Sequence, residues 1–319
     1  MRIFTTNRRR SVAAQGEVRL IREVRRWLGD TNPRTPFGIG DDCAVLPPSR
    51  HAQLVTTDPV IHGRHFDDSV SARAAGAKLL KRNLSDIAAM GGRPVSTVLS
   101  LALAPETDVG WLRLFYLGLA ACARRYGVRV VGGDITQAPA GFFGAFLTLH
   151  GKSNGPRVVT RQGARAGDRL YVTGALGGSR LGHHHRFSPR LAEGAWLARR
   201  GEVRAMLDLS DGLAKDLDAL TSAGLEAALV GTDIPVSAAA RRLSRRTGQT
   251  PLAHALGDGE DYELLIVVRP GRTRESFERD WRRRFPRVRL TCIGRFALKG
   301  KLPPGALPLG EYHGFEHLR

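Results

Sequence analysis

Hydrophobic residues are spaced in two different ways along the first half of the chain. Some segments repeat apolar residues every three or four positions, which predicts amphipathic helices, whereas short apolar runs beside acidic residues or glycines predict strands. The predicted helices span residues 17–29, 72–91 and 111–126, and the predicted strands span residues 38–46, 53–58, 128–134 and 142–151. Helices alternating with strands are typical of an α/β domain.

A similar pattern resumes after the polar, turn-rich segment KSNGPR at residues 152–157, which is the best candidate for a linker. The strands predicted beyond it span residues 168–174, 204–210 and 262–268, followed or preceded by helices at about 213–223 and within 269–289. We therefore expect three parts, namely a disordered extension (1–14), an N-terminal domain (15–151) and a C-terminal α/β domain (158–319). The length of 319 residues suits two domains of about 150 residues each.

The composition restricts where such a protein works. No apolar stretch approaches the roughly 18 uncharged residues of a membrane span, and the arginine-rich N-terminus lacks a signal-peptide core. The three cysteines are odd in number and have no metal-ligand spacing, which argues against a disulfide framework or a structural zinc. We expect a cytoplasmic protein with no membrane partner.

The net charge of +19 invites a nucleic-acid-binding interpretation, because basic surfaces neutralise phosphates. However, Phe277, Trp281 and Phe285 recur every four residues within the densest arginine run, which predicts an amphipathic helix with solvated arginines. We favour that interpretation and expect no nucleic-acid partner. A positive potential still attracts anionic phosphate esters, at modest screened strength.

Several motifs resemble functional sites incompletely. GALGG at residues 174–178 follows a predicted strand and could hold a phosphate at a helix start, but no full fingerprint follows it. His183, His184 and His185 cannot all face one ion from a regular backbone, so a solvated turn is the better prediction. Cys43 lies beside two aspartates that would raise its pKa, which favours a small buried side chain over a nucleophile.

Aspartates at the ends of predicted elements are the most informative feature. Asp86 is surrounded by apolar residues on a predicted helix, where a charge must be paired or bind a cation. Asp134 follows two glycines at a strand end, and Asp208 and Asp211 bracket a strand-to-helix junction. Three further aspartates lie at predicted loop or strand ends, namely Asp41, Asp42 and Asp58. Oxygen donors without His or Cys suit Mg²⁺, which indicates nucleotide phosphate chemistry.

Taken together, the motifs resemble the thiamine-monophosphate kinase family of the aminoimidazole ribonucleotide synthetase superfamily. They are collinear from about residue 15 to the end of the chain. The matching segments are GE near residue 16, GIGDDCAVL (38–46), TTD (56–58), HGRHF (62–66), KRNLSDIAAMGGRP (81–94), GGDIT (132–136), TRQGARAGD (160–168), DLSDGLAKDL (208–217), GDGEDYELL (257–265) and GFEHL (314–318). Asp258 stands where the family commonly has Gly.

The resemblance implies a two-domain α/β (α+β) fold of the aminoimidazole ribonucleotide synthetase type, whose N-terminal sheet pairs with that of a second subunit in a homodimer. It also implies site residues. The implied Mg²⁺ ligands are Asp42, Thr56, Thr57, Asp58, Asp86, Asp134, Asp208 and Asp211, with all but Thr56, Thr57 and Asp58 counted as catalytic. The implied ATP contacts are Gly133, Asp134, Arg161 and Ser210, and the implied thiamine monophosphate contacts are His65, Glu260 and Phe315.

The activity implied by the resemblance is the ATP-dependent phosphorylation of thiamine monophosphate to thiamine diphosphate, with Mg²⁺ assisting direct transfer. Two alternatives stay open at this point. One is another ATP-dependent member of the superfamily, although selenophosphate synthetase and hydrogenase-maturation proteins depend on a reactive cysteine or selenocysteine, and this chain ends GFEHLR without cysteine. The other is a basic nucleic-acid-binding protein.

Overall fold

Two compact units make up the chain in the computed structural model, one formed by Met1–Ile87 with Arg93–Ser153 and the other by Ala88–Gly92 with Asn154–Arg319. The structure describes residues 2–15, 17–34, 37, 39, 46, 48–155, 157–271 and 274–315. No helix among these residues is long and apolar enough to cross a membrane.

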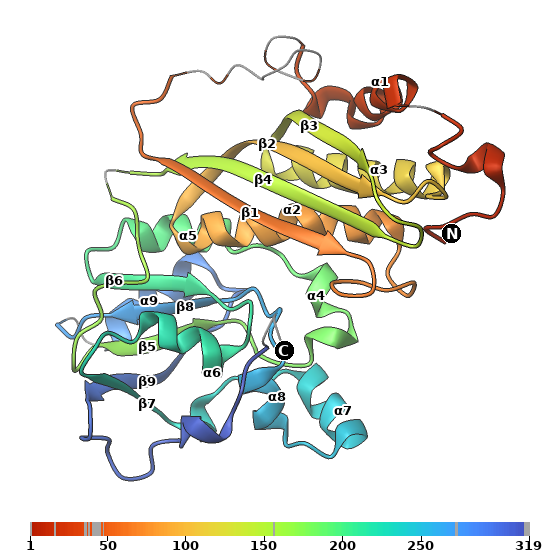
Figure 1. Cartoon of the computed structure of the whole chain (residues 1–319). Helices are drawn as coiled ribbons and strands as arrows, with labels where there is room; N and C mark the ends of the chain where they lie inside the picture. The colour runs from red at the N-terminus through yellow and green to blue at the C-terminus, as the bar shows by residue number, and fades with distance from the viewer. Residues whose placement is uncertain are drawn as a thin grey trace. The chain divides into compact units, whose positions relative to one another are not determined.

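The first unit is a four-stranded sheet with helices against one face (Figure 1). Its strand order is β1-β4-β2-β3, with β1 antiparallel to β4 and β2 parallel to β3. Its helices are α1 (Glu17–Leu28), α2 (Ala72–Ala89) and α3 (Val109–Tyr126), and its strands are β1 (Gln53–Ile61), β2 (Gly92–Leu103), β3 (Arg129–Gln137) and β4 (Phe143–Ser153). This mixed α/β arrangement confirms the predicted fold class.

Close packing between α2 and α3 explains a glycine in the first turns of α2. A Cβ atom added to Gly76 would lie 2.0 Å from the carbonyl oxygen of Phe115, so no larger residue fits where the helices meet. Helix α3 is also well capped, because the Asp108 carboxylate accepts the N–H of Trp111 and Gly127 ends the helix with a φ of 67°. The close contact at Gly76 sets the position of α2, which carries Asp86, against α3.

Residues 2–15 differ from the predicted disordered extension. Ile3 and Val12 are buried, and the Asp108 N–H donates to the Ile3 carbonyl oxygen at 2.6 Å. The Arg10 guanidinium lies 2.6 Å from the buried Asp108 carboxylate. Two apolar residues that flank the basic run thus pack against the unit, and polar contacts with Asp108 fix the segment between them.

The second unit contains a five-stranded antiparallel sheet with the order β6-β8-β5-β9-β7. The strands are β5 (Arg169–Thr173), β6 (Val203–Asp208), β7 (Leu225–Leu229), β8 (Leu264–Val268) and β9 (Leu290–Leu298). The helices are α4 (His183–Arg186), α5 (Leu191–Ala198), α6 (Leu213–Asp216), α7 (Ala238–Thr247), α8 (Pro251–Gly257) and α9 (Arg274–Arg284). The predicted helix at 213–223 is shorter than expected, since a 3₁₀ turn at Leu217–Leu220 follows α6.

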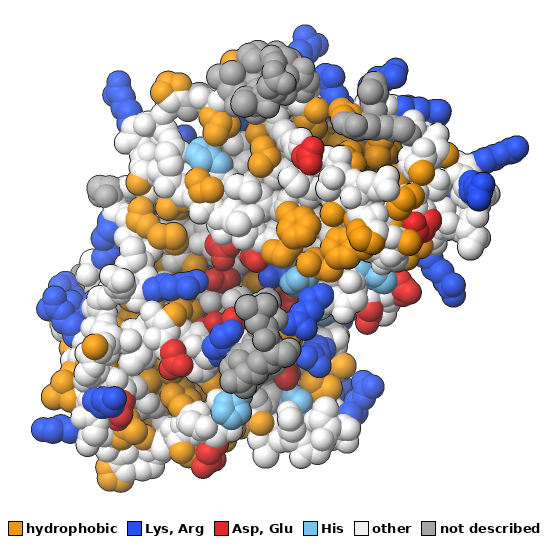
Figure 2. Space-filling view, in the orientation of Figure 1, with side chains coloured by type: hydrophobic (Ala, Val, Ile, Leu, Met, Phe, Trp, Pro, Cys, Tyr) orange, Lys and Arg blue, Asp and Glu red, His pale blue; other side chains and the backbone are white. Residues whose placement is uncertain are grey.

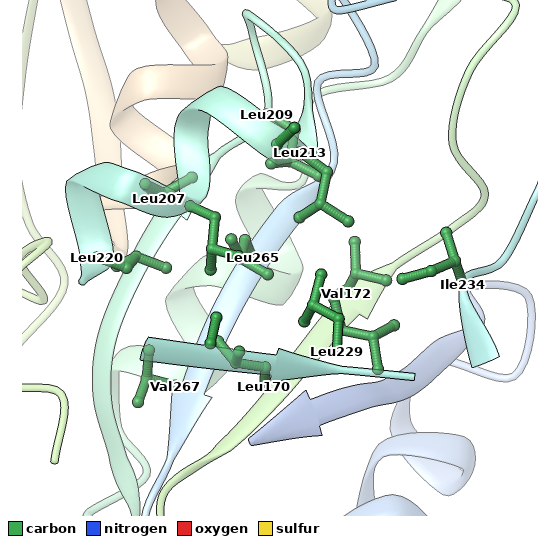
Figure 3. Close-up of a cluster of buried hydrophobic side chains, with 14 of the residues drawn as sticks. Leu170, Val172, Leu207, Leu209, Leu213, Leu220, Leu229, Ile234, Leu265 and Val267 are labelled. Carbon is green, nitrogen blue, oxygen red and sulfur yellow. The ribbon is translucent and has the colours of Figure 1, made fainter. Parts of the chain in front are cut away.

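Both faces of this sheet are buried, so β8, an interior strand between β6 and β5, is apolar throughout. Leu265 and Val267 point into one core with Leu170, Leu207 and Leu213, as Figure 3 shows. The alternate residues of β8 pack on the other side against a cluster that includes Trp281 of the basic helix α9. Phe277 and Trp281 on the aromatic face of α9 are therefore buried as predicted, and Arg279, Arg282, Arg283 and Arg284 are exposed to solvent.

Candidate active site

Strand β1 and helix α2 bring together part of the predicted acidic site in the first unit. The Thr56 hydroxyl donates to the Asp86 carboxylate at 2.5 Å, and the Asp58 carboxylate lies 3.1 Å from the Arg82 guanidinium. Arg82 precedes Asp86 by one helical turn, so α2 presents a carboxylate and a balancing cation to the same side of β1. Half-buried Asp86 thus has the polar surroundings that its apolar helix required.

Other predicted ligands of this unit lie elsewhere. Thr57 alternates with Thr56 along β1, and its hydroxyl donates to the Leu147 carbonyl oxygen at 3.1 Å on the opposite face of the sheet. Asp134 is exposed on β3, opposite Ser100 of β2. Because β1 and β3 are the two edges of the four-stranded sheet, Asp58 and Asp134 are separated by three strand spacings, about 14 Å.

The remaining predicted residues of the first unit have structural contacts of their own. Gly133 lies where β2 and β3 approach closely, since an added Cβ atom would be 2.2 Å from the Leu99 carbonyl oxygen. His65 accepts the Ile61 N–H through Nδ1 at 3.0 Å, and Lys78 donates to the His65 carbonyl oxygen at 2.6 Å. Asp42, Asp41 and Cys43 lie outside the described residues.

In the second unit, the turn after β6 gathers several carboxylates. Asp208 ends β6 and is buried, and the backbone N–H groups of Ser210 and Asp211 both donate to one oxygen of Asp216, each at 2.9 Å. Burial, followed by the negative charges of Asp208 and Asp211, raises the pKa of Asp216 to about 7, despite these hydrogen bonds. The turn therefore concentrates negative charge that a cation would relieve.

The segment around Glu260 forms backbone hydrogen bonds with this turn. The N–H of Glu260 donates to the Ser210 carbonyl oxygen at 2.7 Å, and the N–H of Tyr262 donates to the Leu209 carbonyl oxygen at 2.8 Å. Glu260 and Tyr262 have positive φ angles of 54° and 51°, a region that side-chain-bearing residues seldom occupy. Two strained residues in one turn are held by their hydrogen bonds to the DLSD motif.

The C-terminal segment reaches the same place. The N–H of Phe315 donates to the Asp211 carbonyl oxygen at 2.8 Å, and the Lys215 ammonium group donates to the Phe315 carbonyl oxygen at 2.6 Å. The same ammonium group pairs with the Asp211 carboxylate at 2.7 Å. The structure thus assembles Asp208, Ser210, Asp211, Glu260 and Phe315 around one turn, although they are spread over more than a hundred positions.

Arg161 lies on the segment before β5, and its side chain is exposed. The neighbouring Thr160 carbonyl oxygen accepts the N–H of Met206 at 3.0 Å, so this segment runs beside β6, the strand that ends at Asp208. Among the described residues, no three His, Cys, Asp or Glu side chains are grouped so that they could hold a metal ion on their own.

Known proteins are similar to this chain over most of its length. Residues 40–151 match the family described as AIR synthase related protein, N-terminal domain. The thiamine-monophosphate kinase of Rhodopirellula baltica is 36% identical, with 88% of this chain and 92% of that protein covered. The chain belongs to the thiamine-monophosphate kinase family.

Solved structures of the thiamine-monophosphate kinase family have the same fold. The enzyme from Stenotrophomonas maltophilia matches with a TM-score of 0.73 and 29% identity, covering 89% of this chain and 94% of that one. The structure of AaThiL complexed with AMPPCP and TMP matches with a TM-score of 0.71 and 28% identity, covering 96% and 98% of the two chains.

The Gly-rich turn at 174–178 is not a phosphate cradle in this member of the thiamine-monophosphate kinase family, because carboxylates and carbonyl groups already occupy its amides. The Gly177 N–H donates to Asp261 at 2.8 Å, and the Gly178 N–H donates to Asp258 at 2.7 Å. The Gly174 and Leu176 N–H groups donate to backbone carbonyl oxygens. Asp258, where the family commonly has Gly, thus closes the turn.

Three contributors to the site were missed by the sequence analysis. Lys215 and Asp216 follow the DLSD motif within one helical turn, and their spacing from Asp211 was the only available signal. The histidine run was expected to be a solvated turn, but His183 and His184 are partly buried in α4. The Nε2 atom of His183 lies 2.9 Å from the Asp261 carbonyl oxygen, so α4 packs against the turn that holds Glu260.

Proposed function

We propose that this protein is a cytoplasmic, Mg²⁺-dependent kinase that transfers the γ-phosphoryl group of ATP to thiamine monophosphate, giving thiamine diphosphate. The observation that carries the proposal is the joint assembly of the DLSD turn, Glu260 and Phe315 in a chain 36% identical to a thiamine-monophosphate kinase. The AaThiL structure with AMPPCP and TMP supports both substrates, since AMPPCP is an ATP analogue.

The carboxylates fit Mg²⁺ better than a softer metal. Asp86 and Thr56 offer oxygen donors in the first unit, and buried Asp208 lies near Asp211 and Asp216. Burial, and then the negative charges of Asp208 and Asp211, raise the pKa of Asp216. We propose that Asp58, Asp86, Asp134, Asp208 and Asp211 hold Mg²⁺, with Asp42 and Thr56 as further ligands. The Thr57 hydroxyl, which lies on the opposite face of β1, is not assigned to the site. When bound, Mg²⁺ neutralises the phosphate oxygens and stabilises charge during transfer. A site without a complete cage suits this ion, which binds through few carboxylates and through substrate phosphates.

The other residues align two anionic reactants rather than activate a nucleophile. The phosphate of thiamine monophosphate is ionised near neutral pH, so the reaction needs no strong general base. We assign ATP contacts to Gly133, Asp134, Arg161 and Ser210, because Arg161 is exposed beside β6 and Ser210 lies in the carboxylate turn. We assign thiamine monophosphate contacts to His65, Glu260 and Phe315, which offer a polar ring, a carboxylate and an aromatic face to a cationic ring system.

The exposed sheet face, defined by Val55, Val98 and Phe146, supports a homodimer. These side chains are 69%, 39% and 40% exposed on the sheet of the first unit. Figure 2 shows hydrophobic side chains gathered on the face of this sheet that is turned toward the viewer. An apolar sheet face without a covering layer favours pairing with a second subunit.

Product identification tests the proposed activity. The purified protein is incubated with ATP and Mg²⁺ and with thiamine monophosphate, thiamine or formylglycinamidine ribonucleotide in separate reactions, and the products are identified by mass. We expect thiamine diphosphate and ADP in equal amounts, only in the reaction with thiamine monophosphate. Comparable turnover of thiamine, or turnover of the ribonucleotide, would refute the assignment.

A further inference from the structure

The segment that contains the histidine run follows the Glu260 turn residue by residue. His183 contacts the Asp261 carbonyl oxygen at 2.9 Å, and the Phe187 ring stacks on Tyr262 with centroids 4.0 Å apart. Further along, the Arg190 guanidinium binds both oxygens of the buried Glu263 carboxylate, at 2.7 and 2.5 Å. The clasp, defined as residues 183–190, therefore contacts three successive residues, Asp261, Tyr262 and Glu263.

Within the clasp, His184 faces the side chain of Glu260. Its Nδ1 atom lies 3.8 Å from Oε2 of Glu260, which is beyond a hydrogen bond but within ion-pair range. The other carboxylate oxygen, Oε1, accepts the Tyr262 hydroxyl at 3.2 Å. The Tyr262 hydroxyl thus lies beside one oxygen of Glu260 and the His184 imidazole lies beside the other. The Glu260 side chain remains 28% exposed.

His185 gives the imidazole of His184 a defined orientation. The Nδ1 atom of His185 lies 3.1 Å from Nε2 of His184, and the rings are perpendicular. If Nε2 accepts this hydrogen bond, the proton of neutral His184 is on Nδ1 and points toward Glu260. His185 thus contacts the imidazole of His184 on the side away from Glu260, and Nδ1 of His184 lies near the Glu260 carboxylate.

The strained backbone at Glu260 suits a functional role for its side chain, because such strain is found most often at binding and catalytic sites. A positive φ at both Glu260 and Tyr262 costs free energy, which the clasp and the DLSD turn must offset. The strained turn directs a partly exposed carboxylate whose two oxygens are already oriented. Such preorganisation lowers the conformational entropy that the Glu260 side chain must lose when a ligand binds.

We propose that His184 is a substrate-positioning residue that, supported by His185, holds the Glu260 carboxylate in the orientation that receives the cationic, N–H-bearing part of thiamine monophosphate. This inference rests on the proposed function. It assigns a role to the histidine run, and it places the determinant of substrate affinity in the clasp as well as in Glu260 itself.

Two substitutions at His184 and one control test the proposal. His184→Leu removes the donor, His184→Asn keeps an N–H near the position of Nδ1, and His51→Leu changes an exposed histidine of the first unit. We measure KM and kcat for both substrates, the Kd of thiamine monophosphate without ATP, and the melting temperature. His184→Leu should raise KM and Kd for thiamine monophosphate roughly fivefold and leave kcat and the KM for ATP within about twofold.

His184→Asn should recover most of the affinity, and His51→Leu should behave as the wild type. An unchanged KM and Kd in His184→Leu would overturn the inference, and so would His184→Asn showing the same loss of affinity and melting temperature as His184→Leu, because both results leave only a packing role. If the wild type fails to phosphorylate thiamine monophosphate, the proposed function itself is wrong. A wild type that is active beside an unaffected His184→Leu variant refutes the positioning role alone.

Discussion

The Asp216 carboxylate accepts the backbone N–H of Asp211 at 2.9 Å, five residues earlier in the chain. The same oxygen accepts the N–H of Ser210, so one partly buried side chain satisfies two consecutive amides. The turn that presents Asp208 and Asp211 therefore depends on a carboxylate that need not touch substrate. Its shape is set by the first turn of α6.

Removal of Asp216 should damage both the turn and the activity. Asp216→Ala leaves two partly buried N–H groups without this acceptor, which should lower the free energy of unfolding by about 1–3 kcal/mol and turnover at least about tenfold. Asp216→Asn keeps a carbonyl oxygen acceptor and should lose less of both. Denaturant unfolding and steady-state kinetics provide the measurements, and equal losses in the two variants would contradict the hydrogen-bonding role.

The proposed Mg²⁺ ligands should be needed for turnover more than for folding. Asp86→Asn and Asp211→Asn should each lower kcat at least about a hundredfold, on the order of 3 kcal/mol, with circular dichroism unchanged. Asp30→Asn is the control, since Asp30 is an exposed carboxylate paired with Arg124. Near-normal kcat in either ligand variant would show that its carboxylate is structural.

Glu260 and Phe315 should affect one substrate and not the other. Glu260→Gln should raise the KM for thiamine monophosphate roughly tenfold, about 1.4 kcal/mol, and leave the KM for ATP nearly unchanged. Phe315→Ala should act in the same direction without removing the Mg²⁺ dependence. Glu311→Gln, an exposed glutamate in the C-terminal segment, is the control. Equal losses for both substrates would return Glu260 and Phe315 to a structural role.

The exposed sheet face should mediate dimer formation. We expect a dimer mass by light scattering at micromolar concentration and a shift toward monomer in Val55→Asp, because a charge is costly at a buried apolar interface. Val230→Asp, at an exposed valine of the second unit, should leave the mass unchanged. A wild-type protein that is monomeric under these conditions would refute the proposal.

Cys122 should resist alkylation in the folded protein. Burial raises the pKa of its thiol to about 12, so at pH 8 about one molecule in ten thousand carries the reactive thiolate. Because the shift is upward, reactivity should increase about tenfold for each unit of pH between 8 and 11. Iodoacetamide labelling followed by mass spectrometry, with the denatured chain as control, checks this expectation. Rapid labelling of native Cys122 would show that the thiol is accessible.

Periodicity along the chain was sufficient for elements whose burial is regular. The helix at 72–91 and the strand at 142–151 were predicted to within two residues of α2 and β4, because their apolar positions dominate the local pattern. Strands β2, β7 and β9 were not predicted. The first contains Pro94 and several hydroxyl side chains, and the second is short and alanine-rich, so neither has a strong strand pattern without its sheet neighbours.

The sequence by itself determined which chemistry is present, since only aspartates in the DLSD and NLSD motifs and the collinear family motifs were needed to infer a phosphate site. Tertiary structure decided which residues meet. A one-residue step along β1 directs Thr56 toward Asp86 and Thr57 to the other face. Likewise, Glu260 forms a hydrogen bond with Ser210, fifty residues earlier in the chain, and His184 lies beside Glu260, more than seventy residues later. Such contacts depend on how the chain closes its loops, which no local pattern encodes.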